Sequence, residues 1–380
     1  MDFEFSEKHK ALRQAVREFA EKEIAPLVDE AEEKERFPKE LFPKIGERGY
    51  LCLSYPAKYG GSDLGRIGEC IAVEEISRVS VGIAAGLATQ GGIATSSILY
   101  HGSEEQKQKY LVPAIKGQKI SAFGLTEPNA GSDAAALETT AVKQGDKYII
   151  NGSKKYITNG PICDYALVAA YTDRSQKPSR GISVFIMERD TPGFTQKKMR
   201  KFCMRSADTA ELFFDNCAVP AENLIGEEGR GFVYVMESLD GGRISHSATS
   251  IGLAQAAYEA ALSYTQQRIQ FGQPIYNFQA ISFKIARMAI DIEAARWLMY
   301  RAAWMYDQGM RRFNESAMTK LFASEVAQRV TSEAMQIHGG VALMSDSPVQ
   351  RYFRDSRRAT ITEGTSEIQQ IVISRGLVMH

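Results

Sequence analysis

The sequence lacks an excess of either charge. Its 46 Lys and Arg residues balance 46 Asp and Glu residues. A chain without net charge has no long-range field that would attract nucleic acid or an anionic membrane. We therefore expect no nucleic-acid partner, although a local basic cluster can still bind a phosphorylated ligand.

Cysteine is scarce and has no paired spacing. The chain has five cysteines, at positions 52, 70, 163, 203 and 217, and no Cys-x-x-Cys motif. An odd number of isolated cysteines favours reduced thiols in a cytoplasmic compartment over disulfides or structural zinc. We expect small core residues, a cytoplasmic location and no metal site.

No run of apolar residues is long enough to span a membrane. The stretch of lowest charge, Val81 to Leu99, is interrupted by four glycines and by hydroxyl and amide side chains. The first residues, MDFEFSEKHK, are acidic where a signal or transit peptide would be basic. The sequence predicts neither a membrane span nor a leader.

Several catalytic motifs are also absent. The chain has no Gly-x-x-x-x-Gly-Lys phosphate loop, no His-Glu-x-x-His motif and no Gly-x-Ser-x-Gly turn. The glycines at 226, 229 and 231 lack the βαβ pattern of a dinucleotide fingerprint. His338, beside two glycines, is interpreted as a hydrogen-bonded polar group, with a ligand contact as the alternative.

The pattern of apolar and β-prone residues changes twice along the chain and so divides it into three blocks. At 380 residues it exceeds what one core usually serves, so two or three domains are expected. Helical spacing of apolar residues predicts helices over residues 7–24, 39–47, 67–78, 84–100 and 104–116. Short β-prone runs follow at 147–150, 164–171, 181–187 and 209–214, after which a long helical pattern resumes. We predict domains at residues 1–120, 121–228 and 229–380, with the chemistry between them.

Two segments carry a resemblance. Gly124-Leu-Thr-Glu-Pro-Asn-Ala-Gly-Ser-Asp133 lies where the helical and β blocks meet, and its composition alone also suits a plain connector. Together with Gln336-Ile-His-Gly-Gly-Val-Ala-Leu-Met-Ser-Asp346, it resembles the two signatures of the acyl-CoA dehydrogenase flavoproteins. The similarity extends through 156–160, 204–209, 239–243, 268–272 and 362–369, and so covers essentially the whole chain.

The resemblance implies a multidomain α+β fold. Its parts are an N-terminal α-helical domain, a middle β-barrel and a C-terminal four-helix bundle. This order agrees with the three blocks of the residue pattern. It also implies bound FAD, an acyl-CoA substrate, a homotetramer, and electron-transfer flavoprotein as the electron acceptor.

The resemblance further assigns the cofactor contacts. One set would line the flavin, with Ser132 near the pyrophosphate and the CoA arm: Phe123, Leu125, Thr126, Ser132, Tyr156 and Thr158. A second set would reach the adenine half across a subunit boundary: Arg268, Gln270, Phe271, Gln336, Gly339 and Gly340. Thr365 and Glu367 complete the set. Without the resemblance, Arg268 could equally be an ordinary arginine at the end of a helix.

The resemblance assigns the catalytic base to Glu363. Without the resemblance, Glu363 would be interpreted as a residue that merely precedes a helix, because Ser366 and Gln369 have capping-box spacing. In a minority of the family the base comes from the position occupied here by Gly242, which leaves Glu363 as the candidate. Burial would raise the pKa of a carboxyl from about 4.3 toward the operating pH. Glu363 would take the α-proton, its backbone N–H would hold the thioester oxygen, and the flavin would accept the β-hydride.

Four more positions resemble substrate contacts. Asp240 and Arg243 match a CoA-contacting pair at the start of a helix, although a surface ion pair is the plainer alternative. Thr362 and Gly364 flank the candidate base.

Departures from the family pattern bear on the substrate. Thr362 stands where an aromatic residue is common, Ala342 where glycine is common and Tyr156 where tryptophan is frequent. Thr362, Gly242 and the small residues of 84–100 predict a wide pocket, and the absence of Arg and Lys from Val81 to Ser103 predicts an uncharged acyl group. We therefore expect a neutral, branched or cyclic acyl group of short to medium size. A straight butyryl-type chain is the alternative, as are an acyl-CoA oxidase and a catalytically silent CoA-binding or assembly protein.

Overall fold

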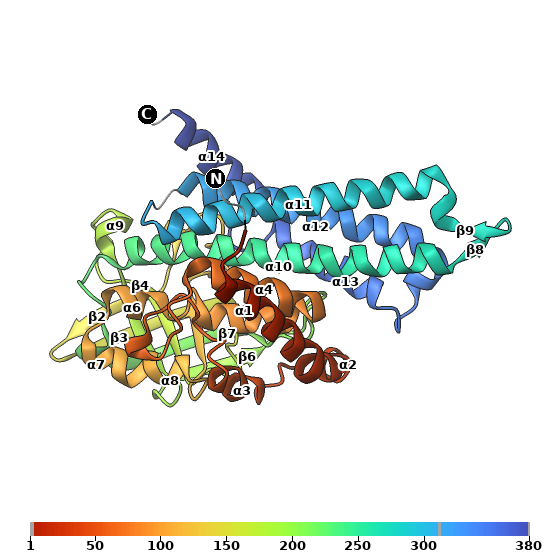
Figure 1. Cartoon of the computed structure of the whole chain (residues 1–380). Helices are drawn as coiled ribbons and strands as arrows, with labels where there is room; N and C mark the ends of the chain where they lie inside the picture. Colours follow the sequence, from red (N-terminus) through yellow and green to blue (C-terminus); the bar gives the residue numbers. More distant parts are fainter. Residues whose placement is uncertain (1–3, 311–312, 379–380) are drawn as a thin grey trace.

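The structure, a computed structural model, describes residues 4–310 and 313–378. Its first part is helical (Figure 1). The buried apolar side chains of these helices belong to a core that also includes residues of the sheet and the bundle. They are α1 (Glu7–Phe19), α2 (Val28–Glu33), α3 (Leu41–Glu47), α4 (Gly65–Val79), α5 (Val81–Gly91), α6 (Ser96–His101), α7 (Glu104–Gln106) and α8 (Val112–Ile115). Local signals set their starts: Ser6 caps α1 by accepting the His9 N–H, and Ser103 forms a capping box with Gln106 at α7.

The helix predicted over residues 84–100 is wrong in one respect, because the chain forms two helices there. Helix α5 ends at Gly91, and α6 begins at Ser96. Between them Gly92 adopts φ −127° and ψ −101°, and the Thr95 hydroxyl donates to the Gln90 carbonyl at 2.6 Å. This break places Ile93 in a loop that reaches the site described below.

The middle part is one curled seven-stranded sheet. Its strands are β1 (Ser121–Gly124), β2 (Thr140–Gln144), β3 (Lys147–Thr158), β4 (Tyr165–Tyr171), β5 (Ile182–Glu188), β6 (Phe194–Lys198) and β7 (Thr209–Pro220). They pair in the order β1-β4-β2-β3-β7-β6, and β5 pairs with β4. The four predicted runs fall in β3, β4, β5 and β7. The other three strands are short, and β2 and β6 carry several polar residues, so the pattern did not mark them.

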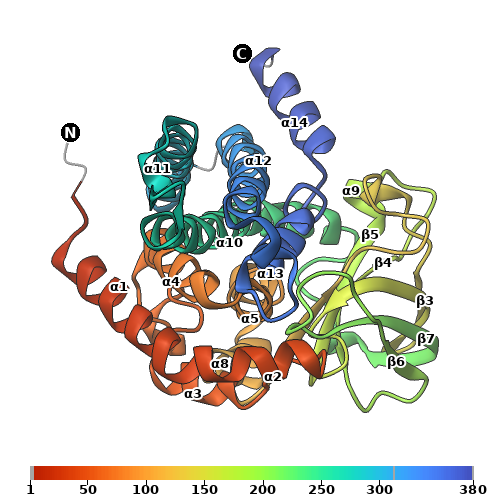
Figure 2. The same cartoon turned by 90° about the vertical axis from the view of Figure 1, so that its right-hand side faces the viewer.

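The last part is a helical bundle. It consists of α10 (Gly231–Gln267), α11 (Gln279–Asp307), α12 (Phe313–His338), α13 (Pro348–Ser356) and α14 (Ser366–Val378), with the small hairpin β8 (Ile269–Gln270) and β9 (Gln273–Pro274). Figure 2 shows α10 between α4 and α5 on one side and α11 and α12 on the other. Every α10 residue from Asp240 to Ala254 is buried, so this helix is the common wall of the N-terminal part and the bundle.

The structure also bears on cysteine, membrane and metal chemistry. All five cysteines are free thiols, and four are buried, whereas Cys203 is only partly buried. Across residues 4–310 and 313–378 no helix is long and apolar enough to cross a membrane. The same residues contain no cluster of three His, Cys, Asp or Glu side chains suited to a metal ion.

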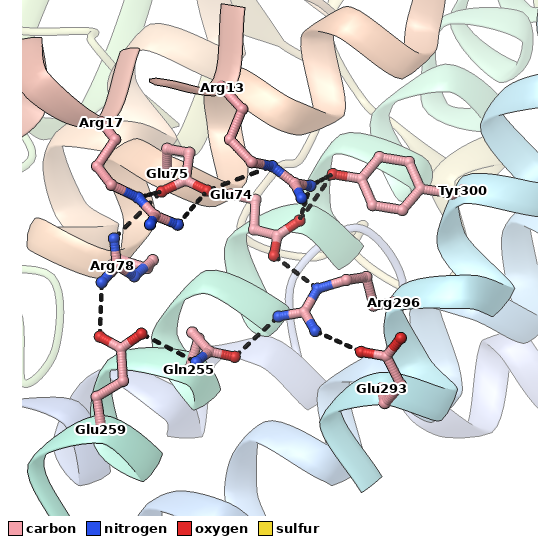
Figure 3. Close-up of polar contacts among 10 residues, drawn as sticks. All are labelled: Arg13, Arg17, Glu74, Glu75, Arg78, Gln255, Glu259, Glu293, Arg296 and Tyr300. Atoms are coloured by element: carbon pink, nitrogen blue, oxygen red, sulfur yellow. Dashed lines mark hydrogen bonds and ion pairs between the residues drawn. The ribbon is translucent and has the colours of Figure 1, made fainter. Parts of the chain in front are cut away.

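A buried ionic network ties the N-terminal helices to the bundle (Figure 3). Glu74 of α4 accepts hydrogen bonds from Arg296 at 2.9 Å and Tyr300 at 2.8 Å, both on α11. Its neighbour Glu75 pairs with Arg17 of α1 at 2.9 Å. Both carboxylates are almost fully buried, so each depends on these partners to offset the loss of hydration.

We predict that Glu74→Gln lowers the free energy of unfolding by about 3–5 kcal/mol, since it leaves Arg296 without its buried counter-charge. Glu293 also pairs with Arg296 but is 55% exposed, so Glu293→Gln should cost no more than ~1 kcal/mol. Urea unfolding of both variants at pH 7 measures the difference. Equal losses would show that the buried pairing of Glu74 is not what stabilises this junction.

Candidate active site

A strained turn presents Glu363. The turn lies between the 3₁₀ segment η9 (Arg357–Thr360) and α14, and φ is +57° at Glu363 and +87° at Gly364. The Gln369 side chain donates to the carbonyls of Glu363 at 2.9 Å and Gly364 at 3.0 Å. Lys320 of α12 donates to the Gly364 carbonyl at 2.7 Å. A non-glycine residue in the left-handed region persists only where the surroundings hold it, and such positions cluster at functional sites.

The capping box that the spacing of Ser366 and Gln369 would allow does not form. Thr365 caps α14 instead, because its hydroxyl accepts the Ile368 N–H at 3.3 Å. The Gln369 side chain turns back to the Glu363 turn, and the Ser366 hydroxyl has no partner. Glu363 is therefore more than a residue before a helix, because its backbone is held by side chains from two helices.

The carboxylate of Glu363 faces Gly242 of α10. A Cβ added to Gly242 would lie 3.1 Å from Glu363 Oε2 and 2.7 Å from Ile93 Cγ2. The two positions from which the family draws its base thus converge on one point, and here only Glu363 supplies a carboxylate. Gly242 and Ile93 form the wall opposite that carboxylate.

Burial dominates the electrostatics of Glu363. It raises the pKa of the Glu363 carboxyl above its ordinary value, and the cations Arg243, Lys320 and Arg358 act in the opposite direction. Glu363 Oε2 is buried without a hydrogen-bond partner. A carboxyl with a raised pKa and a buried oxygen that has no hydrogen-bond partner is a candidate general base or acid.

Unpartnered polar atoms gather around this turn. Within the described residues, buried side-chain atoms without a hydrogen bond include seven from α10, α12 and the 363–369 segment. They are Arg243 Nε, His246 Nδ1, Glu315 Oε2, Thr319 Oγ1, Glu363 Oε2, Ser366 Oγ and Gln369 Oε1. Native proteins leave few such atoms, so a cluster of them indicates groups reserved for a ligand.

The predicted pair Asp240 and Arg243 lies inside α10, not at its start. The helix begins at Gly231, nine residues before Asp240, because the glycine-rich turn at 226–231 already leads into it. Asp240 and Arg243 are 3% and 8% exposed, so the alternative of a surface ion pair is also wrong. Asp240 accepts a hydrogen bond from Ser316 of α12.

His246 is a site residue that the sequence analysis missed. It lies one helical turn after Gly242, on the face of α10 that points to the Glu363 turn. Its Nε2 is 2.9 Å from the Thr362 hydroxyl. Burial, with Arg358 and Lys320 nearby, holds the pKa of His246 well below its usual range, so the ring is neutral. The four-residue spacing from Gly242 was the available signal.

The predicted flavin-lining residues come from β1, β3 and the loop after β1. Phe123 lies in β1 and Thr158 ends β3. The Lys155 N–H donates to the Thr126 carbonyl at 2.8 Å, which joins the two segments. A bulge between Lys154 and Ile157 turns Tyr156 outward, with φ +62° and 61% exposure. Leu125 is buried and Ser132 is exposed.

The order of the 124–133 loop depends on Glu127, which the sequence analysis did not single out. This buried carboxylate binds the fully buried Lys154 at 2.6 Å and the Thr139 N–H at 3.1 Å. The loop is therefore anchored to the sheet rather than being a free connector.

The second predicted cofactor set lies elsewhere, at the far end of the bundle near β8 and β9 (Figure 1). Tyr264 of α10 stacks on His338 of α12 at 4.4 Å, which brings the two segments of the set together. They hold Arg268, Gln270 and Phe271 on one side and Gln336, Gly339 and Gly340 on the other. Phe271 is 92% exposed, an unusual state for a phenylalanine.

The structure also shows the surroundings of His338 and Ala342, which lie near this set. His338 Nδ1 lies 2.8 Å from the Ala334 carbonyl, so the preferred interpretation of a hydrogen-bonded polar group is confirmed. Ala342 is buried in the 3₁₀ segment η8 (Gly339–Leu343) and has no positive φ, so its methyl group causes no backbone strain.

Comparison with known proteins gives a consistent result. Family models described as the N-terminal, middle and C-terminal domains of acyl-CoA dehydrogenase match residues 6–118, 122–217 and 229–378. A short-chain-specific acyl-CoA dehydrogenase of Clostridium acetobutylicum is 44% identical, over 98% of this chain and 99% of its own.

Solved structures agree with these matches. The butyryl-CoA dehydrogenase of Megasphaera elsdenii superposes with a TM-score of 0.97 at 42% identity over 100% of both chains. A chain from a structure described as the electron transferring flavoprotein of Acidaminococcus fermentans gives a TM-score of 0.98 at 45% identity, also over 100% of both chains.

We predict that Gly364→Ala destabilises the protein more than Gly309→Ala does. Both positions have positive φ, +87° and +71°, so both variants pay ~1–3 kcal/mol of backbone strain. Only at Gly364 would the new Cβ also meet the Gln369 amide, at 2.6 Å, whereas Gly309 faces open space. Displacing Gln369 from its carbonyls should add ~1–3 kcal/mol. Urea unfolding of the two variants tests this, and equal losses would mean that Gln369 does not hold the turn.

Proposed function

This chain belongs to the acyl-CoA dehydrogenase family, and we propose that Glu363 is the base with which it oxidises the Cα–Cβ bond of a short, neutral acyl-CoA. It is an FAD-dependent oxidoreductase with the acyl-CoA dehydrogenase fold. The alternative of a catalytically silent protein on the same scaffold is therefore set aside. The observation that carries the proposal is the buried, unpartnered Glu363 Oε2 facing Gly242.

The residues present fit FAD. Tyr156, turned outward by the bulge, and Thr158 lie in the last part of β3, and the Lys155 N–H joins this part of the strand to the Thr126 carbonyl. We propose that they line the flavin, as Phe123 and Leu125 would beside them, with Ser132, Thr365 and Glu367 as further contacts. Bound FAD supplies the acceptor for the hydride that leaves the substrate β-carbon.

The protein's part in the reaction is to take and hold a proton. Glu363 in its ionised form removes the α-proton, and the raised pKa of this buried carboxyl makes it a stronger base than an exposed glutamate. We propose that the Glu363 backbone N–H binds the thioester oxygen and stabilises the negative charge that develops there. Gly242 and Ile93 lie on the side of the site that the carboxylate faces.

The CoA arm needs polar contacts along the same path. Arg243 has an unpartnered Nε in the buried site, which supports its assignment as a substrate contact. Asp240, oriented by Ser316, is proposed as the second contact from α10. Thr362 and Gly364 complete the set on either side of the base.

The acyl group is proposed to be short and uncharged. Ile93 limits the depth beside Gly242, and no Arg or Lys lies between Val81 and Ser103 to pair with a terminal carboxylate. His246 occupies the space beside Thr362, which favours a straight butyryl-type chain. The branched or cyclic acyl group inferred from Thr362 is the second candidate, since Thr362 itself leaves room that an aromatic ring would fill.

The second cofactor set and the bundle surface support a homotetramer. Arg268 and Phe271 are exposed and flank β8, which lies at the tip of the bundle, away from the seven-stranded sheet (Figure 1). A groove of about 1060 Å³ on α11, α12 and α13 is lined by Phe202, Phe283 and Phe353, all substantially exposed. We propose that a second copy covers these surfaces and brings its FAD to Arg268, Gln270, Phe271, Gln336, Gly339 and Gly340.

Electron-transfer flavoprotein is the proposed electron acceptor. A similar chain occurs in the Acidaminococcus fermentans structure described above, and a relative from Acetobacterium woodii is named as a subunit of a caffeyl-CoA reductase–Etf complex. These names support a partner of this class. An acyl-CoA oxidase would instead pass electrons to oxygen.

We predict that Glu363→Gln retains FAD but loses turnover by about 10²–10⁴-fold, because the amide cannot accept the α-proton. Anaerobic bleaching of the flavin by butyryl-, isobutyryl- and cyclohexanecarbonyl-CoA, followed by kinetics with an artificial acceptor, measures this. Wild-type protein that none of the three thioesters bleaches would contradict the proposed function. Near-normal turnover of the variant would assign the proton to another group, and oxidation by air alone would favour an oxidase.

We predict that Arg268→Ala lowers both FAD retention and the size of the oligomer, since one arginine would serve the neighbouring subunit's cofactor. Flavin content after gel filtration and the mass from light scattering, with and without added FAD, provide the test. Arg200, whose side chain is 90% exposed on the β domain, is the control position. Unchanged flavin content and mass in Arg268→Ala would refute the cross-subunit assignment.

A further inference from the structure

We propose that Lys320 is a positioning residue for the catalytic base: it holds the Gly364 carbonyl and so fixes the turn that presents Glu363 to the substrate. This inference rests on the proposed function in so far as Glu363 is the base. It adds a residue from α12 that neither the sequence motifs nor the spacing marked.

The first argument is the burial of Lys320. Its side chain is 0% exposed, and its ammonium donates to the Gly364 carbonyl at 2.7 Å. A lysine is rarely buried completely, because its charge loses the hydration that water supplies. The hydrogen bond to the Gly364 carbonyl offsets part of this lost hydration. The burial of Lys320 is therefore better explained by its contact with the turn than by packing alone.

The second argument is the conformation that Lys320 holds. Glu363 and Gly364 have φ of +57° and +87°, two consecutive left-handed residues. For Glu363 this conformation is unfavourable by itself. Lys320 from α12 and Gln369 from α14 together supply three hydrogen bonds to the two carbonyls. Without them the turn can relax and move the carboxylate away from Gly242.

The third argument is charge. Lys320 lies close enough to Glu363 that its ammonium lowers the pKa of the carboxyl and opposes the effect of burial. The other charged groups facing Glu363 are Arg243 of α10 and Arg358 of η9, while His246 of α10 is neutral. Glu367 of α14 acts on Lys320 in the same direction as Glu363 does. Arg358 donates to the Thr362 hydroxyl at 3.5 Å, whereas Lys320 donates to a backbone carbonyl of the turn, that of Gly364, at 2.7 Å.

Two pH effects follow, and their signs differ. Glu363 must be ionised to act, so kcat/KM falls as the pH drops through its raised pKa. Removing the Lys320 charge raises the pKa of Glu363 further. The fall of kcat/KM at low pH, the acid limb of its pH profile, then moves to higher pH. Burial lowers the pKa of Lys320 itself to about 8. Above that pH the Lys320 ammonium loses its charge, so it no longer lowers the pKa of Glu363.

The test compares Lys320→Met with a matched control in the FAD-loaded enzyme. Methionine keeps the length of the side chain but removes charge and donor. Lys201 is the control because it also donates to a backbone carbonyl, that of Ala207 at 2.7 Å, and its pKa is likewise lowered to about 8. We expect Lys320→Met to lower kcat at least tenfold, with a smaller change in KM, and to shift the acid limb upward. Lys201→Met should leave the acid limb in place.

A second variant separates anchoring from charge. Gln369→Met removes two of the three hydrogen bonds without changing any charge, so it should lower kcat and leave the acid limb where it is. Lys320→Arg, which keeps both charge and donor, should recover part of the lost kcat.

Hydrogen exchange gives a readout that does not depend on turnover. In both Lys320→Met and Gln369→Met, backbone amides of residues 361–365 should exchange faster than in the wild type and in Lys201→Met. Wild-type kcat, pH profile and exchange in Lys320→Met would overturn the proposal. If the wild type turned over no acyl-CoA, the proposed function would fail, and the exchange measurement would still decide whether Lys320 holds the turn.

Discussion

The close approach of α10 to its neighbours is the constraint on which the rest of this structure depends. At Gly252 an added Cβ would lie 2.2 Å from the Glu74 carbonyl of α4, and at Gly242 it would lie 3.1 Å from Glu363 Oε2. At Gly252 the contact is with backbone and needs a residue without a side chain, whereas at Gly242 an added Cβ would crowd the Ile93 and Glu363 side chains. The same helix therefore joins the N-terminal part to the bundle and leaves the space into which the carboxylate points.

Charged side chains are buried where these helices pack closely. The buried charges fall into two groups. At the junction of α4 with α1 and α11, Glu74 and Glu75 are matched by arginines and a tyrosine, which makes the junction a structural element. Around Glu363 the polar atoms are left partly unmatched. Unmatched buried groups destabilise the fold, so their concentration at one turn marks where a ligand restores the missing contacts.

Local signals predicted much of the fold. Apolar spacing marked most of the N-terminal helices, and β-branched and aromatic runs marked β3, β4, β5 and β7. The helix over 84–100 was predicted as one piece because its small residues are compatible with helix throughout, whereas the break at Gly92 depends on contacts with Tyr55 and Thr95. Strands β2 and β6 were missed because their pairing partners, not their own composition, make them strands. The domain limits at residues 120 and 228 stay predictions.

The sequence by itself determined the three-part order of the chain, the two signature segments and the candidacy of Glu363, because these depend on residue type and spacing along the chain. Tertiary structure alone decided that Asp240 and Arg243 are buried inside α10, that Thr365 caps α14 in place of Ser366, and that His246 and Lys320 stand beside the base. Those placements depend on which helices meet and how closely. The separation of Glu363 from Lys320 is 43 positions in the chain, and only the packing of α12 against the 363–364 turn brings the Lys320 ammonium to 2.7 Å from the Gly364 carbonyl.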